Sequence, residues 1–439
     1  MFGYYFKLGV RSLRRNPALT ALMVITLAVG VAASMSTLTV LHMMSGDPIP
    51  HKSQRLFVPV LDAGPKDGWS PGQDPDDIQM TYRDATNLYD AGKVGEHRAI
   101  IYGVNMAVEP ERKDLGAFSE QGLAATHDMF QMFEVPFKYG QPWTAAEDKG
   151  AADVVVLSTG LADRLFGNVN PVGKRVRMKG VSWQVVGVAD HWKPLPRYYH
   201  IISGNGEYGD EEGYYVPFSA AIRHETSNSG SMNCNERNAV PGYAGVLQSN
   251  CTWIQFWIET ASAGDRGEVT NYLDNYVHEQ NRMGRMPRKQ PAKLYNVMEW
   301  LDLNKVVGND NRLAVWLAFG FLALCLVNTI GLLLAKFSVR APEVGIRRAL
   351  GASRREIFSQ FLIETAVVGL VGGAIGLALA YGTLGLLSMA SGSMKNLAHM
   401  DASMLVLTLL LSIGAAIIAG LLPTWRACQV TPALQLKSQ

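Results

Sequence analysis

The sequence predicts an α-helical membrane protein with four transmembrane helices, arranged 1 + 3, and a large mixed α/β extracytoplasmic domain inserted between the first and second helices. Two observations support this fold class. Long uncharged apolar runs lie near the two ends of the 439-residue chain, and the residues between the first and second runs have the composition of an ordinary soluble domain. With 48% hydrophobic residues, 18% charged residues and a formal net charge of +2, the composition excludes a disordered protein and gives no reason to expect a nucleic-acid partner.

Four runs are long enough to cross a bilayer, because a spanning helix needs about 20 apolar residues. They cover residues 18–44, 313–334, 365–389 and 404–422, and none of them contains Lys, Arg, Asp or Glu. The first run is too long for a cleavable signal peptide. Ion-coupled carriers and ion channels place ionisable residues within their spans, so the uncharged runs argue against both classes.

Small residues recur at every fourth position within these runs. The repeats are Thr26, Gly30 and Ser34; Gly369 and Gly373; Gly372 and Gly376; and Ser412, Ala416 and Gly420. Such spacing lets helix backbones approach closely. The pattern leaves open whether these faces pack within one chain or against a second copy.

Basic residues cluster before the first run, between the second and third, and after the fourth. They are Lys7, Arg11, Arg14 and Arg15; Lys336, Arg340, Arg347, Arg348, Arg354 and Arg355; and Arg426 and Lys437. Because Lys and Arg on short loops stay in the cytoplasm, we expect both termini inside and residues 45–308 outside. Residues 2–15 also place apolar and basic side chains on opposite helical faces, which indicates an interfacial amphipathic helix ahead of the first span in residues 1–44.

The segment between the first and second runs shows both strand and helix patterns. A β run at 154–157 is followed by Ser158 as a helix N-cap, residues 175–185 alternate as a hairpin, and residues 269–276 are helical in period. Residues 194–249 are rich in Gly, Asn, Ser and Tyr with little periodicity. We interpret them as an irregular insert or long surface loops.

No catalytic, nucleotide-binding or metal-binding motif stands out. Residues 167–174 superficially resemble a phosphate loop, but five residues separate the glycines instead of four, and Arg175 stands where Ser or Thr would hold magnesium. The chain has no Gly-x-Ser-x-Gly or His-Glu-x-x-His pattern, and its nine histidines lack ligand spacing. We therefore expect no enzyme activity in this chain and no cofactor or metal bound to it directly.

The four cysteines divide into two pairs of different kinds. Cys234 and Cys251 are the two in the extracytoplasmic segment, and they lie close enough in sequence to close a short loop, so we predict a disulfide. Cys325, within a span, and Cys428, on the cytoplasmic side, should remain free thiols.

The basic segment between the second and third runs predicts a short helix at residues 342–350. Its end signals are Pro342 and Glu343 at the start, Arg347 and Arg348 in the last turn, and Gly351 as a left-handed stop. Ser353 and Glu356 then form a capping box that begins the next helix.

One face of this short helix is apolar. Ile346, Ala349 and Leu350 fall on it together and would fit the groove of a partner protein. The alternative is a basic loop that rests on anionic lipid, and the residues alone leave both interpretations open.

Several sequence blocks resemble the MacB-like, FtsX-type permeases of ABC transporters. Near the apolar runs these blocks are residues 13–17, 342–353, 422–427 and 431–433, and in the central segment they are residues 130–148, 170–174 and 185–188. Together with the 1 + 3 topology, the resemblance covers most of the chain. It implies a MacB-like α/β domain at 45–308 and a three-helix FtsX-like domain at 309–439.

The resemblance also implies partners and a mechanism. Members of the family are dimeric permeases of the bacterial inner membrane, with the large domain in the periplasm. They bind cytoplasmic ATPase subunits through the short helix that matches residues 342–350, and ATP-driven closure is relayed through the spans to the outer domain, which is called mechanotransmission. MacB itself carries a fused ATPase domain before its first span, whereas this chain begins at the membrane, so we expect a separate ATPase subunit that holds the ATP and Mg.

Two functional interpretations follow from the resemblance. The leading one is a permease subunit that serves efflux or export of a drug, peptide or lipid-linked substrate, together with a second permease subunit, a periplasmic adaptor and an outer-membrane duct. The alternative is a transmembrane signalling scaffold that senses a peptide or activates an extracellular hydrolase without transport. Residues 194–249 match no family pattern, which leaves the substrate or partner open. The sequence also leaves open whether the dimer pairs identical or related chains.

Overall fold

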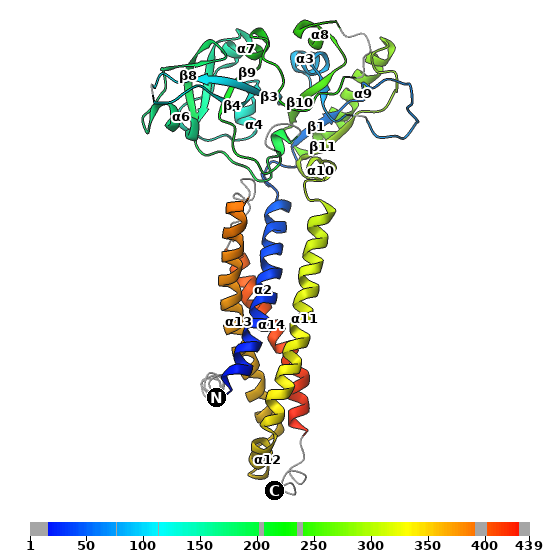
Figure 1. Ribbon diagram of the computed structural model, residues 1–439. Coiled ribbons are helices and arrows are strands. Elements are labelled where there is room, and N and C mark those ends of the chain that lie inside the picture. Colours follow the sequence, from blue (N-terminus) through cyan, green and yellow to red (C-terminus); the bar gives the residue numbers. More distant parts are fainter. Residues whose placement is uncertain are drawn as a thin grey trace. The chain divides into compact units, whose positions relative to one another are not determined.

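The computed structural model describes residues 16–75, 77–112, 114–201, 206–234, 240–390 and 402–429. The chain divides into two compact units (Figure 1). The helical unit combines the two ends of the chain, Met1–Ser45 and Val307–Gln439, and the α/β domain comprises Gly46–Val306. The amphipathic helix expected at residues 2–15 lies outside the described residues.

Four long helices run alongside one another in the helical unit (Figure 1). They are α2 (Pro17–Ser45), α11 (Asn309–Val339), α13 (Arg354–Ala390) and α14 (Ala402–Cys428), and a short helix, α12 (Ala341–Ala349), connects α11 to α13. All four long helices are long and apolar enough to cross a membrane. The prediction of four such helices, one before the α/β domain and three after it, is therefore confirmed.

Two of these helices extend beyond their apolar runs. α13 begins at Arg354, whereas its run begins at residue 365, and α11 continues past residue 334 to Val339. The extensions place Lys336 and Glu364 in the interior of the helical unit, with exposed fractions of 0% and 1%. Both residues lie just outside the uncharged runs, which mark only the apolar part of each helix.

The small residues of the spans pack against other helices of the same chain. A Cβ added at Gly369 would lie 2.5 Å from the Cβ of Ala416 on α14, and one added at Gly376 would lie 2.9 Å from the Ala28 carbonyl oxygen on α2. A Cβ added at Gly30 would lie 3.0 Å from the Cβ of Cys325 on α11. The alternative left open by the sequence is thus decided for these faces, which hold the bundle together within one chain.

The α/β domain is built on one mixed sheet with the strand order β11-β1-β10-β3-β4-β9-β6-β8-β5, and β2 and β7 pair at its sides. The strands are β1 (Leu56–Val60), β2 (Met80–Thr81), β3 (His97–Glu109), β4 (Phe118–Ala125), β5 (Phe137–Gly140), β6 (Val154–Ser158), β7 (Arg175–Met178), β8 (Val181–Ala189), β9 (Tyr214–Pro217), β10 (Thr252–Glu259) and β11 (Lys293–Asn296). The pairs β4–β9 and β6–β8 are parallel, and β3–β4 and β3–β10 are antiparallel. The fold class of a mixed α/β domain after the first helix is therefore confirmed.

Short helices connect the strands and cover the sheet. They are α3 (Tyr82–Ala91), α4 (Met129–Met132), α5 (Ala145–Lys149), α6 (Thr159–Phe166), α7 (Phe218–Arg223), α8 (Tyr243–Gln248), α9 (Arg266–Arg282) and α10 (Val297–Leu303). Figure 1 shows two groups within the domain: β1, β10 and β11 lie with α3, α8, α9 and α10, and β8 and β9 lie with α6 and α7. The long strands β3 and β4 stand between the two groups in the sheet order.

Strand residues alternate between two apolar layers, so the sheet is covered on both faces. On β3, Ile100 and Tyr102 belong to one buried cluster, and Ala99 and Ile101 belong to the other. This alternation follows from the period of two along a strand. The hydrophobic core of the domain therefore lies on both sides of β3.

The local predictions for this domain are mostly confirmed. β6 ends at Ser158, whose Oγ accepts the backbone N–H of Leu161 at 3.1 Å and so caps α6. The hairpin is formed by β7 and β8, and α9 covers the expected helical segment.

The interpretation of residues 194–249 as an irregular insert is wrong in its central part. β9 pairs with β4 on one side and with β6 on the other, so this segment supplies a strand to the interior of the sheet. All four residues of β9 are buried. A four-residue strand that is buried on both faces shows no alternation of polar and apolar residues, which is why the sequence pattern did not reveal it.

Candidate coupling site

The residues that the sequence singled out define α12 at both ends. The helix begins after Arg340, one residue earlier than predicted, with Pro342 in its first turn and Arg347 and Arg348 in its last turn. Gly351 follows with a φ of 99°, a left-handed conformation that glycine adopts without steric cost. The predicted helix and its glycine stop are therefore confirmed.

A capping box fixes the start of α13. The Glu356 backbone N–H donates to Ser353 Oγ at 3.3 Å, and the Ser353 backbone N–H donates to Glu356 Oε2 at 2.9 Å. The turn between the two helices is further closed by the Ala352 N–H, which donates to the Arg347 carbonyl at 3.0 Å. The short helix and the long one are thus joined by a hydrogen-bonded turn and not by a free loop.

The inner face of α12 packs against the bundle. Val344 is 5% exposed and belongs to a buried cluster with Phe337 of α11 and with Ile357 and Phe361 of α13. Burial of a valine side chain contributes roughly 1.5–3 kcal/mol. Apolar packing therefore holds the centre of α12 to its two neighbours.

Polar contacts hold the sides of α12. Arg347 pairs with Glu343 one turn earlier, at 2.5 Å, and donates from Nη1 to Gln360 Oε1 of α13 at 3.1 Å. Arg348 donates from Nη1 to the Cys428 carbonyl of α14 at 3.4 Å. These arginines and Glu343, predicted as a polar rim, lie beside the packed face and attach α12 to two long helices.

The predicted contact face of α12 points away from these neighbours. Ile346 and Leu350 are 58% and 83% exposed, and Ala349 is also exposed. An exposed apolar face on a helix that is otherwise held in place is typical of a docking surface. The structure places all three residues on the exposed face of a helix that packs on the bundle, and whether a partner protein or lipid covers this face stays a prediction.

One charged residue that the sequence did not single out, Glu364, lies beside α12. Arg340, at the α11–α12 boundary, and Lys336 both contact Glu364 of α13. The available signal was weak, because Glu364 comes directly before the apolar run at 365–389 and nothing in the sequence pairs it with a basic residue.

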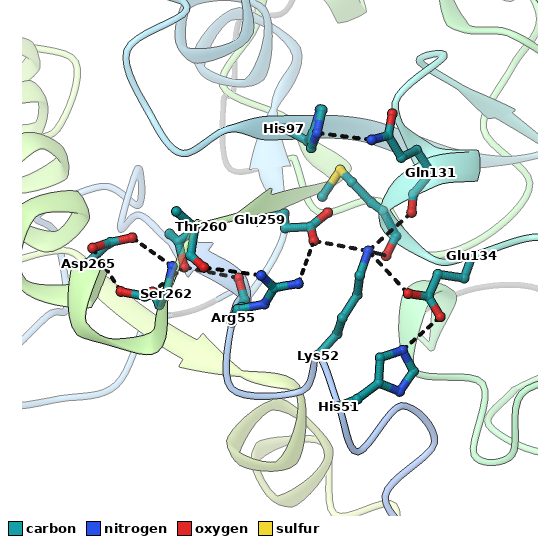
Figure 2. A network of polar contacts seen from close by, with 12 residues as sticks. His51, Lys52, Arg55, His97, Gln131, Glu134, Glu259, Thr260, Ser262 and Asp265 are labelled. Atoms are coloured by element: carbon teal, nitrogen blue, oxygen red, sulfur yellow. Dashed lines mark hydrogen bonds and ion pairs between the residues drawn. The ribbon is translucent and has the colours of Figure 1, made fainter.

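A second polar network lies in the α/β domain, in the residues that soon follow α2 (Figure 2). Lys52 Nζ lies 3.0 Å from Glu259 Oε1 and 3.5 Å from Glu134 Oε1, and the Lys52 and Glu259 side chains are 12% and 6% exposed. Arg55 contacts the same Glu259 oxygen at 3.4 Å, and His51 contacts Glu134 at 2.8 Å. This network ties the first residues of the domain to β10 and to the segment after α4.

The first and last residues of the α/β domain are also bonded to each other. The Val297 N–H donates to the Ser53 carbonyl at 3.3 Å, and Asn296 Nδ2 donates to Gln54 Oε1 at 3.1 Å. The strands β1 and β11 pair directly beside these contacts. Both covalent connections to the helical unit therefore leave the domain from one region, an arrangement between distant residues for which the sequence gave no signal.

A cavity of about 510 Å³ in the α/β domain is lined by aromatic and charged residues, among them Tyr82, Arg98, His127 and Asp148. His127 Nε2 lies 2.9 Å from Asp128 Oδ1, and Nδ1 lies 3.8 Å from Asp148 Oδ2. The carboxylate of Asp128, and after it that of Asp148, raises the pKa of His127 to about 9. Charged side chains of both signs line this cavity, so its chemistry singles out no class of ligand.

The remaining predicted residues are the cysteines. Cys234 and Cys251 form a disulfide, and Cys325 and Cys428 are free and buried. Within the described ranges, no group of three or more His, Cys, Asp and Glu residues is arranged to hold a metal ion.

Two family models match the chain. The MacB-like periplasmic core domain matches residues 20–276, and the FtsX-like permease C-terminal domain matches residues 315–432. The first match alone covers more than half of the chain, and the second covers most of the last three long helices.

Curated relatives and solved structures are similar to the same regions. The macrolide export ATP-binding/permease protein MacB of Rhodopirellula baltica is 25% identical over 382 residues, which is 84% of this chain and 53% of the relative. The pyoverdine export ATP-binding/permease protein PvdT of Pseudomonas aeruginosa is 24% identical, over 71% of this chain and 41% of the relative. The crystal structure of the periplasmic region of MacB from Actinobacillus actinomycetemcomitans has a TM-score of 0.37 and 14% identity, over 60% of this chain and 96% of that chain.

The chain spans between about a third and a half of the length of the curated relatives MacB of Bdellovibrio bacteriovorus (34%) and Rhodopirellula baltica (53%). The two family matches follow each other along the chain in the order of the α/β domain and the last three long helices. On this evidence the chain belongs to the MacB-like, FtsX-type family of ABC transporter permeases.

Proposed function

We propose that this chain is a permease subunit that couples ATP hydrolysis by a separate cytoplasmic ATPase to motion of its α/β domain. Family membership and the four long apolar helices support the proposal. The names of relatives describe export of macrolides and pyoverdine, so we propose efflux or export of a drug, peptide or lipid-linked substrate. ATP and Mg would bind to the ATPase.

In this proposal the four helices cross the bacterial inner membrane, both termini are cytoplasmic and the α/β domain is periplasmic. The basic residues around α12 support this orientation, because Lys and Arg near helix ends stay on the cytoplasmic side. A second permease subunit, a periplasmic adaptor and an outer-membrane duct complete the proposed assembly.

The observation that supports the proposal most directly is the exposed apolar face of α12. Ile346, Ala349 and Leu350 lie outward, while Val344 on the opposite side is packed into the bundle. A helix held in this way can transmit a push from a partner, whereas a loop on lipid would absorb it. The face is therefore the proposed docking surface for the ATPase.

The test is co-purification of the ATPase with permease variants at equal membrane expression. Ile346→Asp puts a charge into an apolar contact, which should weaken binding by about 2 kcal/mol or more, roughly 30-fold in affinity. Ala349→Trp should act similarly by overfilling the groove. Arg354→Ala, just outside α12, is the control and should retain the ATPase.

Two readouts decide the outcome. If Ile346→Asp retains the ATPase and its activity in full, the segment rests on lipid and the proposed coupling site is wrong. If Ile346→Asp loses the ATPase, the accumulation of candidate drugs and peptides is compared between wild-type and Ile346→Asp cells. A difference supports export over the signalling alternative, because only a transporter changes substrate distribution when docking is lost.

A further inference from the structure

Three charged side chains meet in the interior of the helical unit. Glu364 of α13 accepts both Lys336 Nζ of α11, at 2.7 Å, and Arg340 Nη1, at 2.9 and 3.2 Å to its two carboxylate oxygens. Lys336 is fully buried, and its Nζ also lies 3.5 Å from Thr20 Oγ1 of α2. The carboxylate thus joins α11 and α13, and Lys336 extends the cluster to Thr20 of α2.

Stability alone does not account for this cluster. Buried ion pairs recover their desolvation cost only in good geometry, and well-packed apolar residues are often at least as stabilising. What this contact supplies in addition is an anchor for the guanidinium, because Arg340 Nη1 donates to both carboxylate oxygens of Glu364 in a charge-assisted contact. Arg340 is the residue at which α11 ends and α12 begins, since the Val344 N–H donates to its carbonyl at 3.1 Å. The pair with Glu364 therefore fixes the bend between those two helices.

A second polar contact lies one turn away on α13. Gln360 accepts from Arg347 at 3.1 Å, and Gln360 and Glu364 are four residues apart, which places them on one face of α13. Their partners Arg347 and Arg340 are seven residues apart, and so share one face of the α12 segment. Val344 packs between them on the bundle. The short helix is held at both ends and in its middle.

We propose that Glu364 is a positioning residue that makes α12 move as one body with α2, α11 and α13. A push on α12 then reaches three long helices at once and is not lost in the α11–α12 bend. The consequence for transport rests on the proposed function of α12 as the ATPase docking helix, whereas the rigidity itself does not.

The first experiment measures rigidity in the full-length permease without ATPase, reconstituted in lipid nanodiscs. Spin labels are placed on cysteines introduced at Leu350 and Leu370, which are 83% and 45% exposed, in a Cys325→Ser, Cys428→Ser background. Double electron–electron resonance should give a narrow distance distribution. Glu364→Gln should broaden and shift it by about one helical turn, ~5 Å.

Two further variants keep the result interpretable. Asp310→Asn is the matched acid-to-amide control in the same unit, because Asp310 is exposed in the first turn of α11, and it should leave the distribution narrow. Lys336→Met with Glu364→Leu removes the buried Lys–Glu pair together and so avoids stranding Lys336 without its carboxylate. This double variant should broaden the distribution as Glu364→Gln does, because Arg340 has lost its acceptor.

The second experiment adds the ATPase to the unlabelled proteins. Glu364→Gln should still co-purify the ATPase, since its docking face is intact, but the ATP-dependent change in hydrogen–deuterium exchange of the α/β domain should be lost. If wild-type permease binds no ATPase, the proposed function fails while the distance measurement still tests the positioning role. A distribution as narrow as wild type in both Glu364 variants would overturn the inference, because packing of Val344 alone would then hold α12.

Discussion

Replacing Gly369 by alanine should loosen the packing of α13 on α14. The added Cβ would lie 2.5 Å from the Ala416 Cβ and 3.0 Å from the Ser412 carbonyl oxygen, so one of the two helices has to shift. Gly382 lies on the same helix, and a Cβ added there would have no heavy atom within 4 Å among the described residues. Gly382→Ala is therefore the matched control.

Two contributions set the change in unfolding free energy. Alanine is favoured over glycine in a helix by about 0.8–1 kcal/mol, and both variants gain this contribution equally. Overpacking costs about 1–3 kcal/mol and applies only at Gly369. The difference between the variants isolates packing, so Gly369→Ala should unfold about 2–12 °C below Gly382→Ala, at roughly 2–4 °C per kcal/mol for a unit of this size.

The cysteines provide an assay that reports on the helical unit alone. The chain has four cysteines, of which Cys234 and Cys251 are joined and Cys325 and Cys428 are free and buried. Both free thiols belong to the helical unit. A fluorogenic thiol-reactive dye in a thermal ramp therefore reacts when this unit opens, independently of the α/β domain.

A second-site change tests the cause. Ala416→Gly in the Gly369→Ala background removes the contact between the two Cβ atoms but leaves the approach to the Ser412 carbonyl, so recovery should be partial. Equal labelling temperatures for Gly369→Ala and Gly382→Ala would refute the reasoning, because the small-residue face of α13 would then not pack on α14 of the same chain.

Three further predictions concern the α/β domain. Asp62→Ala removes the carboxylate that lies 3.1 Å from the guanidinium of Arg288, a side chain that is 3% exposed. The loss should lower the unfolding free energy by about 3–5 kcal/mol, measured by denaturant unfolding followed by tryptophan fluorescence. The control Asp74→Ala, at an exposed pair with Lys293, should not change the unfolding midpoint. The carboxylates of Asp128 and Asp148 raise the pKa of His127 from 6.5 to about 9, so the stability that this residue contributes should be complete below pH 6.5 and lost as the pH rises through 9. His127→Gln should remove that alkaline loss in melts between pH 6 and 10, and an unchanged pH profile would contradict the ion-pair assignment. Non-reducing peptide mapping should recover Cys234 and Cys251 in one disulfide-linked peptide, and the disulfide should stabilise the local fold by about 3 kcal/mol. Finding both cysteines alkylated in native protein would disprove the bond.

The sequence predicted the elements whose signals are local. Ser158 caps α6, Gly351 ends α12, and Ser353 with Glu356 begins α13, and each of these signals depends on residues within one or two helical turns. The apolar runs likewise identify the four long helices, because a run of that length has few alternatives.

Elements that depend on distant partners could not be predicted in the same way. β9 is a strand only because β4 and β6, which are far from it in sequence, accept it between them. Glu364 likewise has its partners outside its own helix, in Lys336 of α11 and in Arg340 at the α11–α12 boundary, and no local pattern links the three residues. Periodicity describes which face of an element is apolar, but it carries no information on which element covers that face.

Each of the two units is held together by specific contacts between residues that are distant in sequence. In the helical unit, Glu364 joins α12 to the long helices, and close contacts at Gly369 and Gly376 join those helices to each other. In the α/β domain, hydrogen bonds between the segments around Ser53 and Val297 bring its two covalent connections to one region. Lys52 and Arg55 tie the same region to Glu259 of β10, at 3.0 and 3.4 Å, and β10 pairs with both β1 and β3. The first and last residues of the domain are therefore bonded to each other and to a central strand of its sheet.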